Sequence, residues 1–308
     1  MSILITGGAG FIGYHLCKKK LEEGKTVICV DNLHSGQSDN INLLMTYTNF
    51  SFYNINIIFP FNIQEDIAEI YHLACPASPK YYQEDDLYTL DTCYKGTENV
   101  LNLALKKNSK VLFTSTSEIY GEPLEHPQNE EYRGNVNTFG PRSCYDEGKR
   151  VAESLMYAYK KLGVDIRIVR IFNTYGPNMR INDGRVVTNF ISQALSNQPL
   201  TIYGDGSQTR SFCYVDNMVD GLIKLMDSDY GEPLNLGNPE ETTIKELAEM
   251  IKELTNSESE IIYKEIPIDD PTRRKPDITK ATTILNWYPT TDLTQGLIHT
   301  IFYYMNNT

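Results

Sequence analysis

The sequence predicts an α/β protein with a doubly wound parallel sheet and a second, smaller α/β domain. In the first half of the 308-residue chain, short β-branched runs alternate with longer helical patterns, which is typical of βαβ units. The runs are nearly continuously apolar, as from Val27 to Val30, and strands buried on both faces have this composition. After Arg170 the elements become shorter and are separated by turn clusters rich in Gly, Asn and Pro.

The predicted strands are, in chain order, residues 2–6, 26–30, 50–54, 69–73, 110–114 and 165–170. Between them, apolar residues three and four positions apart predict helices over residues 10–23, 82–107 and 143–162. A prior of about 150 residues per domain agrees with two domains. We therefore expect residues 1–172, completed by about 209–238, to form the sheet domain, and residues 173–208 and 239–308 to form the second domain.

The composition is that of an ordinary globular protein and excludes several classes of partner. A formal net charge of −12 makes nucleic acid and anionic membrane surfaces unfavourable partners. No apolar run reaches the roughly 18 residues of a membrane span, and the chain starts with no secretory pattern. The six cysteines form no C-x-x-C pair, and the histidines have no metal-ligand spacing. We expect a cytoplasmic protein with reduced thiols and no metal, in which local arginines hold any anionic ligand.

A glycine pattern directly after the first predicted strand predicts a dinucleotide site. Residues 7–13 read Gly-Gly-Ala-Gly-Phe-Ile-Gly and open the first predicted helix. Gly7 permits a tight turn, Gly10 lets backbone N–H groups approach a pyrophosphate, and Gly13 lets helix and strand pack closely. Asp31 follows the second predicted strand, where a carboxylate can bind both hydroxyls of an adenosine ribose and repel a 2′-phosphate. Because residues 32–38 contain no Lys or Arg, we expect a Rossmann fold that binds NAD rather than NADP.

A Tyr and a Lys four residues apart form the candidate proton-transfer pair. Tyr145 and Lys149 lie on one face of a predicted helix, where the cation can lower the pKa of the tyrosine from about 10. The same spacing recurs at residues 14 and 18 and at residues 157 and 161, which we interpret as ordinary surface positions. Residues 115–118, Ser-Thr-Ser-Glu, follow the fifth predicted strand, and parallel sheets bind ligands at the carboxyl ends of their strands. We therefore expect these polar side chains to face Tyr145.

Several motifs carry a family resemblance that covers the chain from about residue 2 to residue 289. Besides the glycine pattern they are residues 115–121, 144–150, 173–177 and 204–210, and the most diagnostic stretches are 116–118, 145–150, 182–187 and 270–278. On these residues the chain resembles the extended short-chain dehydrogenase/reductases that act on nucleotide sugars, and within them the UDP-glucuronate decarboxylases. The resemblance implies an enzyme with a Rossmann domain for NAD and a smaller domain for the nucleotide sugar.

The resemblance also implies a reaction that converts UDP-glucuronate to UDP-xylose through a 4-keto intermediate. Tyr145, assisted by Lys149, takes the proton of the sugar 4-hydroxyl while NAD⁺ accepts the C4 hydride. Carbon dioxide then leaves C5 of the β-keto acid, and the hydride returns, so that NAD⁺ is regenerated. Whether the product leaves as UDP-xylose or as the 4-keto pentose stays open.

The resemblance assigns roles to three sets of residues. Around the reacting sugar, besides Tyr145 and Lys149, it places Thr116, Ser117, Glu118 and Arg274. The cofactor set is Gly7, Gly10, Phe11, Ile12, Gly13, Asp31, Asn32, Asn56, Leu73, Tyr145 and Lys149. The substrate set is Asn173, Arg185, Tyr203, Gln208, Arg210 and Arg274. The family also implies a homodimer formed through a four-helix bundle, with the helices of residues 82–107 and 143–162.

Two other interpretations remain open: an enzyme of the same fold with another outcome, and a non-catalytic NAD-binding protein. The related 4,6-dehydratases carry an acidic Asp where this chain has Ser117, and a hydroxyl is a poor general acid for their elimination step. A UDP-sugar 4-epimerase needs no guanidinium near the sugar C5. The intact pair of Tyr145 and Lys149 disfavours a non-catalytic protein, which could lose either residue.

Three residues depart from the family pattern. Asn56 stands where relatives usually have an Asp that contacts adenine, and an amide can still hydrogen-bond there. Cys93 replaces an Asn in the helix that precedes Gly96, where we expect a weaker buried polar contact. Cys75 lies near the expected edge of the cofactor site, and we interpret it as a small apolar filler.

Overall fold

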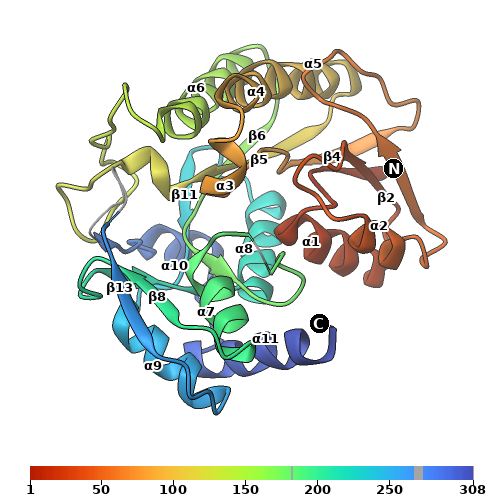
Figure 1. The fold of residues 1–308 in the computed structure, drawn as a ribbon. Helices are drawn as coiled ribbons and strands as arrows, with labels where there is room; N and C mark the ends of the chain where they lie inside the picture. Colours follow the sequence, from red (N-terminus) through yellow and green to blue (C-terminus); the bar gives the residue numbers. More distant parts are fainter. Residues whose placement is uncertain (182, 267–272, 308) are drawn as a thin grey trace.

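The computed structural model describes residues 1–181, 183–266 and 273–307, and its centre is a seven-stranded parallel sheet (Figure 1). In chain order its strands are β1 (Ser2–Thr6), β2 (Val27–Asp31), β3 (Phe50–Asn54), β4 (Ile67–His72), β5 (Lys110–Thr116), β6 (Ile166–Ile171) and β11 (Pro233–Leu236). Across the sheet they run β11-β6-β5-β4-β1-β2-β3, so the winding reverses between β1 and β4. Such a reversal opens a crevice at the carboxyl ends of the strands, where ligands bind.

Helices cover both faces of this sheet (Figure 1). One face carries α1 (Phe11–Glu22), α2 (Ser38–Leu44) and α8 (Val215–Asp227), and the other carries α4 (Asp86–Asp91), α5 (Thr97–Lys107) and α6 (Ser143–Lys161). Successive residues of a strand enter different cores, since Ile3 and Ile5 pack into one core and Leu4 into the other. Burial on both faces explains the continuous apolar runs, and the predicted doubly wound parallel sheet is confirmed.

The prediction of a single helix over residues 82–107 is wrong, because the segment is divided into shorter helices. A short helix, α3 (Pro79–Tyr82), ends before Asp85, whose side chain accepts a hydrogen bond from the backbone N–H of Tyr88 at 2.9 Å and begins α4. A π-helical turn, η1 (Thr92–Gly96), then joins α4 to α5. A polar cap and a π-turn leave the apolar spacing almost unchanged, so the periodicity does not show these breaks.

The six predicted strands agree with the observed ones to within two residues at each end. The sequence analysis did not predict the seventh strand, β11. It has only four residues and begins with Pro233, and proline is unusual in a central strand. β11 lies at the edge of the sheet, beside β6. The edge position explains how the proline is accommodated.

A second group of elements comes mainly from the C-terminal part of the chain (Figure 1). Its helices are α7 (Val186–Leu195), α9 (Ile244–Leu254), α10 (Thr279–Leu285) and α11 (Leu293–Asn307). Its strands are β7 (Thr174–Tyr175), β8 (Leu200–Tyr203), β9 (Thr209–Ser211), β10 (Cys213–Tyr214), β12 (Glu241–Thr243), β13 (Ile261–Lys264) and β14 (Arg273–Arg274). β9 lies between β12 and β14, and this small sheet sets Arg210 opposite Arg274. Within the described ranges, no helix is long and apolar enough to cross a bilayer.

Candidate active site

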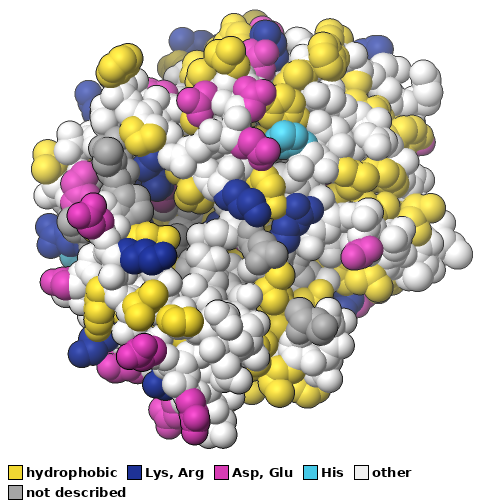
Figure 2. Space-filling model, in the orientation of Figure 1, with side chains coloured by type: hydrophobic (Ala, Val, Ile, Leu, Met, Phe, Trp, Pro, Cys, Tyr) yellow, Lys and Arg dark blue, Asp and Glu magenta, His cyan; other side chains and the backbone are white. Residues whose placement is uncertain are grey.

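One cavity of about 610 Å³ lies between the carboxyl ends of the sheet strands and the second group of elements. Every residue of the predicted catalytic, cofactor and substrate sets lines it, although these residues come from positions 7 to 274 of the chain. Figure 2 shows a hollow in this face of the molecule with Lys and Arg side chains around it. Of the diagnostic motifs, residue 182 and residues 270–272 lie outside the described residues.

The turn between β1 and α1 leaves no space for side chains. Gly7 has a φ of +76°, and a Cβ there would lie 2.7 Å from the backbone nitrogen of Ala74. A Cβ on Gly13 would overlap the carbonyl oxygen of Gly7. The N-cap of α1 is Gly10, and the first turn of the helix lines the cavity, so its backbone N–H groups favour an anionic ligand. This backbone cradle fits the pyrophosphate of a dinucleotide.

The carboxylate of Asp31 is fixed beside the glycine turn. Its two oxygens accept hydrogen bonds from the backbone N–H groups of Ala9 at 3.1 Å and Leu33 at 2.8 Å. Burial raises the pKa of Asp31, and these two hydrogen bonds oppose the shift. The other residues predicted to hold the adenosine side of the cofactor, Asn32, Asn56 and Leu73, line the same cavity. A buried carboxylate at the end of β2 fits a ribose with free hydroxyls, as in NAD.

Tyr145 and Lys149 lie one turn apart on the buried face of α6 and are 6% and 4% exposed. The Nζ of Lys149 donates a hydrogen bond to the carbonyl oxygen of Thr114 at 2.8 Å and lies 5.9 Å from the centre of the Tyr145 ring. Burial, followed by the neighbouring charge of Cys75, raises the pKa of Tyr145, while a hydrogen bond with Thr116 opposes the shift. The expected lowering of the Tyr145 pKa by Lys149 is therefore wrong for the free site, where burial dominates and the tyrosine carries its proton at neutral pH.

Glu118 lies among three arginines. Its Oε2 accepts a hydrogen bond from Arg142 and another from Nη2 of Arg274 at 3.3 Å, and Arg274 also donates to the backbone carbonyl of Ser117. Arg274 is 1% exposed and stands opposite Arg210 in the pairing of β14 with β9. Burial alone would raise the pKa of Glu118, but the charges of Arg274, Arg142 and Arg210 hold it at about 2. These three guanidinium groups line the cavity, and their planar forks suit the oxygens of an anionic substrate.

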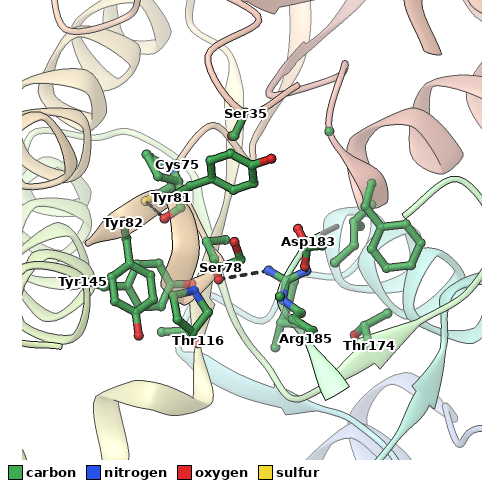
Figure 3. A pocket seen from close by; sticks show the side chains of 18 of the residues that line it. Ser35, Cys75, Ser78, Tyr81, Tyr82, Thr116, Tyr145, Thr174, Asp183 and Arg185 are labelled. Carbon is green, nitrogen blue, oxygen red and sulfur yellow. Dashed lines mark hydrogen bonds and ion pairs between the residues drawn. The ribbon is translucent and has the colours of Figure 1, made fainter. Parts of the chain in front are cut away.

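The predicted substrate residues lie in the same cavity, with Arg185 at the N-cap of α7. Arg185 donates a hydrogen bond to the carbonyl oxygen of Ala77 at 2.9 Å and lies 3.2 Å from a carboxylate oxygen of Asp183. In the view of Figure 3, Asp183 and Arg185 lie opposite Tyr145 and Thr116. The remaining members of this set, Asn173, Tyr203, Gln208 and Arg210, also line the cavity.

Among the cavity residues that the sequence analysis missed are Ser78, Tyr82 and Arg142. The Tyr82 ring stacks on the Tyr145 ring, with centroids 4.9 Å apart and 8° between the planes (Figure 3). The hydroxyl oxygens of Ser78 and Tyr82 are buried and have no hydrogen-bond partner among the described residues, which suits them to bind a ligand. The segment that follows β4 contains both of them, so its place after a parallel strand was the available signal.

Asp146, the residue after Tyr145, lies beside the Glu118 cluster. Its Oδ2 is 4.0 Å from Nε of Arg142, and its Oδ1 is buried without a hydrogen-bond partner among the described residues. Burial and the nearby charge of Glu118 raise the pKa of Asp146 to about 7. Two neighbouring carboxyl groups thus differ in charge below neutral pH, with Glu118 ionised and Asp146 protonated.

Comparison with known proteins assigns the chain to a family. The sequence profile of the NAD dependent epimerase/dehydratase family matches residues 3–237. The chain belongs to this family. NAD is the family's cofactor, and the glycine cradle and Asp31 described above fit it.

Individual relatives within the family are similar over nearly the whole chain. UDP-glucuronic acid decarboxylase 5 of Arabidopsis thaliana is 54% identical over 96% of this chain and 87% of its own length. UDP-glucuronic acid decarboxylase 1 of Danio rerio is 52% identical over 98% of this chain and 72% of its own length.

Solved structures of the same fold include epimerases. A UDP-glucuronic acid 4-epimerase from Bacillus cereus, in complex with UDP-glucuronic acid and NAD, superposes with a TM-score of 0.90 at 28% identity over the full length of both chains. A UDP-glucose 4-epimerase from Thermotoga maritima, with UDP-glucose, superposes with a TM-score of 0.91 at 30% identity over 100% of this chain and 99% of its own. The shared fold therefore does not separate decarboxylation from epimerisation.

The raised pKa of Asp146 predicts a pH dependence of stability. Between about pH 4 and pH 7 the folded protein keeps a proton that the unfolded chain has released, so stability falls as the pH rises through this window. Asp146→Asn removes this titration. The unfolding free energy of the variant minus that of the wild type should therefore be about 1–3 kcal/mol larger at pH 8 than at pH 5.

Urea unfolding of both proteins at pH 5 and pH 8 measures this difference. Asp216→Asn is the control, because the Asp216 side chain is 70% exposed. If the unfolding free energies of Asp146→Asn and the wild type differ by the same amount at both pH values, Asp146 has an ordinary pKa.

Proposed function

We propose that this chain is a UDP-glucuronate decarboxylase that converts UDP-glucuronate to UDP-xylose and carbon dioxide, with NAD⁺ regenerated in each cycle. The observation that carries the proposal is the 54% identity with a decarboxylase of that substrate over 96% of the chain. The site agrees with this substrate, because a UDP-linked sugar acid carries several negative charges and the cavity is lined by four arginines.

In this proposal Tyr145 takes the proton of the sugar 4-hydroxyl. A phenolate is needed for this step, and the positive charges of Lys149 and Arg185 near the ring would stabilise it. The stacked ring of Tyr82 keeps the plane of the Tyr145 ring fixed, so the phenol oxygen is held in one position. When bound, NAD⁺ would supply the acceptor for the hydride from the sugar C4, and this hydride would return to the sugar at the end of the cycle.

Loss of carbon dioxide follows from the oxidation at C4. A ketone at C4 makes the sugar acid a β-keto acid, and the electrons of the broken C5–C6 bond delocalise into that ketone. The resulting enolate then takes up a proton at C5, which gives the 4-keto pentose. The protein must orient the carboxylate so that the C5–C6 bond aligns with the ketone. The Arg274 guanidinium is suited to this task, since its hydrogen bonds to the Ser117 carbonyl and to Glu118 fix its plane. The hydroxyl groups of Thr116 and Ser117 would line the same reaction space.

The second group of elements would hold the UDP moiety. Arg185 and Arg210 carry planar guanidinium groups that suit the diphosphate, and Asn173, Tyr203 and Gln208 offer polar and aromatic contacts for the uridine. With the cofactor held by the glycine turn, this suggests a division of labour. We propose that residues 1–172, completed by about 209–238, bind NAD, and that residues 173–208 and 239–308 bind the nucleotide sugar.

A UDP-sugar 4-epimerase or 4,6-dehydratase is the alternative function. An elimination of water from C6 needs a general acid, and position 117 offers the hydroxyl of Ser117 instead of a carboxyl group. The similarity to solved 4-epimerases, at 28–30% identity, keeps epimerisation as the competing outcome to be tested. A cytoplasmic location stays a prediction from the sequence.

We further propose that the chain forms a homodimer through α4, η1 and α6. These elements expose apolar side chains, with Leu90 37%, Tyr94 43% and Val151 37% exposed. Leu90 borders α6, since a Cβ on Gly148 would lie 3.9 Å from its Cδ2. Two such helical surfaces placed against each other would form a four-helix bundle and bury these side chains.

Product analysis tests the proposed reaction directly. Incubation of the protein with UDP-glucuronate and NAD⁺ should release carbon dioxide and form UDP-xylose. Nuclear magnetic resonance identifies the sugar product. Accumulation of the 4-keto pentose would mean that the cycle ends before the hydride returns. Formation of UDP-galacturonate, or epimerisation of UDP-glucose in a parallel reaction, would overturn the proposal.

Tyr145→Phe tests the proton-transfer role. The variant should lose about 10²- to 10⁴-fold in kcat while NAD binding stays nearly unchanged, because only the phenol oxygen is removed and the ring still stacks on Tyr82. Tyr157→Phe, at an exposed position of the same helix, is the matched control and should keep wild-type turnover. Wild-type kcat in Tyr145→Phe would remove the tyrosine from the mechanism.

Arg274→Lys separates orientation of the sugar acid from binding of the diphosphate. The substitution keeps the charge and loses the planar fork, so we expect kcat to fall on the order of 10²-fold with a much smaller change in the Kd of UDP. Steady-state kinetics and UDP titration measure both quantities. If Arg274 only binds phosphate, UDP affinity falls and kcat stays the same.

The dimer proposal predicts that a charge on the exposed helical surface separates the subunits. In light scattering the wild type should have twice the chain mass of 35.1 kDa, and Leu90→Arg should have the mass of one chain. Leu43→Arg, on the exposed face of α2, is the control and should remain dimeric. A monomeric wild type would overturn the proposal.

A further inference from the structure

Two neighbouring thiols, one of which lines the catalytic cavity, have no part in the proposed reaction. Cys75 lies in the segment after β4 and lines the cavity, while Cys93 lies in η1 and is 2% exposed. Their sulfur atoms are 3.4 Å apart, and both residues are free thiols. A disulfide has an S–S distance of about 2.05 Å, so bond formation needs an approach of about 1.4 Å. The interpretation of Cys75 as an apolar filler does not account for this contact.

The two thiols differ in acidity in the way that a reactive and a resolving cysteine do. The hydrogen bond from Cys93 and the charge of Lys149 lower the pKa of Cys75 to about 7, against the opposing effect of burial. The same hydrogen bond and burial raise the pKa of Cys93. At neutral pH a substantial share of Cys75 is therefore the nucleophilic thiolate, with a neutral thiol beside it.

We propose that Cys75 and Cys93 are a modification site, a dithiol that hydroperoxides convert reversibly to a disulfide at the edge of the active-site cavity. The Cys75 thiolate attacks one peroxide oxygen, so an S–O bond forms, the O–O bond breaks and hydroxide leaves. Cys93 then attacks the Cys75 sulfur, so the S–S bond forms, the S–O bond breaks and the second oxygen leaves as water with the Cys93 proton. Two thiols lose two electrons, and hydrogen peroxide takes them up to give two molecules of water.

Disulfide formation would act on the turn of α6 that carries the proton-transfer pair. A Cβ on Gly148 would lie 3.0 Å from the Cys93 sulfur, so Cys93 packs directly against α6 between Tyr145 and Lys149. Movement of the Cys93 sulfur toward the cavity removes part of this packing. We therefore expect lower turnover in the oxidised protein, an expectation that rests on the proposed function, whereas the modification itself does not.

Mass spectrometry tests the modification without any assay of turnover. The reduced full-length protein is treated with hydrogen peroxide at neutral pH, free thiols are alkylated, and the protein is digested. A peptide pair linked through Cys75 and Cys93 is the expected product, and dithiothreitol should remove it. In Cys93→Ser, Cys75 should be trapped as the sulfenic acid by dimedone.

A second cysteine pair in the same chain provides an internal control. Cys17 and Cys29 are also neighbours, but both are 0% exposed, and the hydrogen bond between them and burial raise the pKa of Cys29. This pair should remain reduced at peroxide concentrations that link Cys75 to Cys93. Complete alkylation of Cys75 and Cys93 after treatment, or a Cys17–Cys29 link formed first, would overturn the proposal.

Activity measurements then connect the disulfide to turnover. Peroxide should lower the kcat of the wild type at least about tenfold, dithiothreitol should restore it, and Cys93→Ser should keep a larger share of its own untreated kcat. An equal loss in Cys93→Ser would show that the disulfide does not control turnover. If the untreated protein has no turnover of UDP-glucuronate, the proposed function fails, and the mass experiment still decides the fate of the dithiol.

Discussion

The contact between Glu118 and its arginines is the interaction on which the geometry of the active site depends. It joins the end of β5 to the residue before α6 through Arg142, and to β14 through Arg274, so it connects the sheet with the second group of elements. A carboxylate out of water is costly unless cations and hydrogen-bond donors surround it. The cluster satisfies Glu118 and places three guanidinium groups in the lining of the cavity. A chain with a net charge of −12 thereby acquires a local site for an anion.

Sequence patterns predicted the parts of the fold that depend on local periodicity. Strands β1 and β2, for example, are nearly continuous apolar runs, because they are buried on both faces of the sheet. The prediction of one continuous helix over 82–107 is wrong, because Asp85 starts a new helix and residues 92–96 form a π-turn. Neither feature changes the spacing of the apolar residues. The strand β11 was not predicted, because four residues are too few to show a periodic pattern of apolar side chains.

The candidate site was predicted where a motif marked it and missed where only tertiary structure assembled it. The glycine turn and Asp31 have a fixed spacing, so both could be placed from the sequence. Tyr82 and Arg142 belong to no motif, and they reach the cavity because α3 and α6 fold over the end of the sheet. The contact of Cys75 with Cys93 joins two elements 18 residues apart, and only their packing brings the sulfurs together.

The position of β14 has a consequence for synthesis of the chain. Glu118 and Arg274 are separated by 156 residues, so at 5–20 residues per second translation needs about 8–30 s to supply the second partner after the first. When Glu118 is made, strands β1 to β5 are complete, and β6 and β11 follow during the interval, before Arg274 is added. The nascent chain therefore holds most of its cofactor cradle before its anion site exists, and a ribosome that stops before residue 274 leaves a polypeptide whose reaction centre lacks its most deeply buried cation.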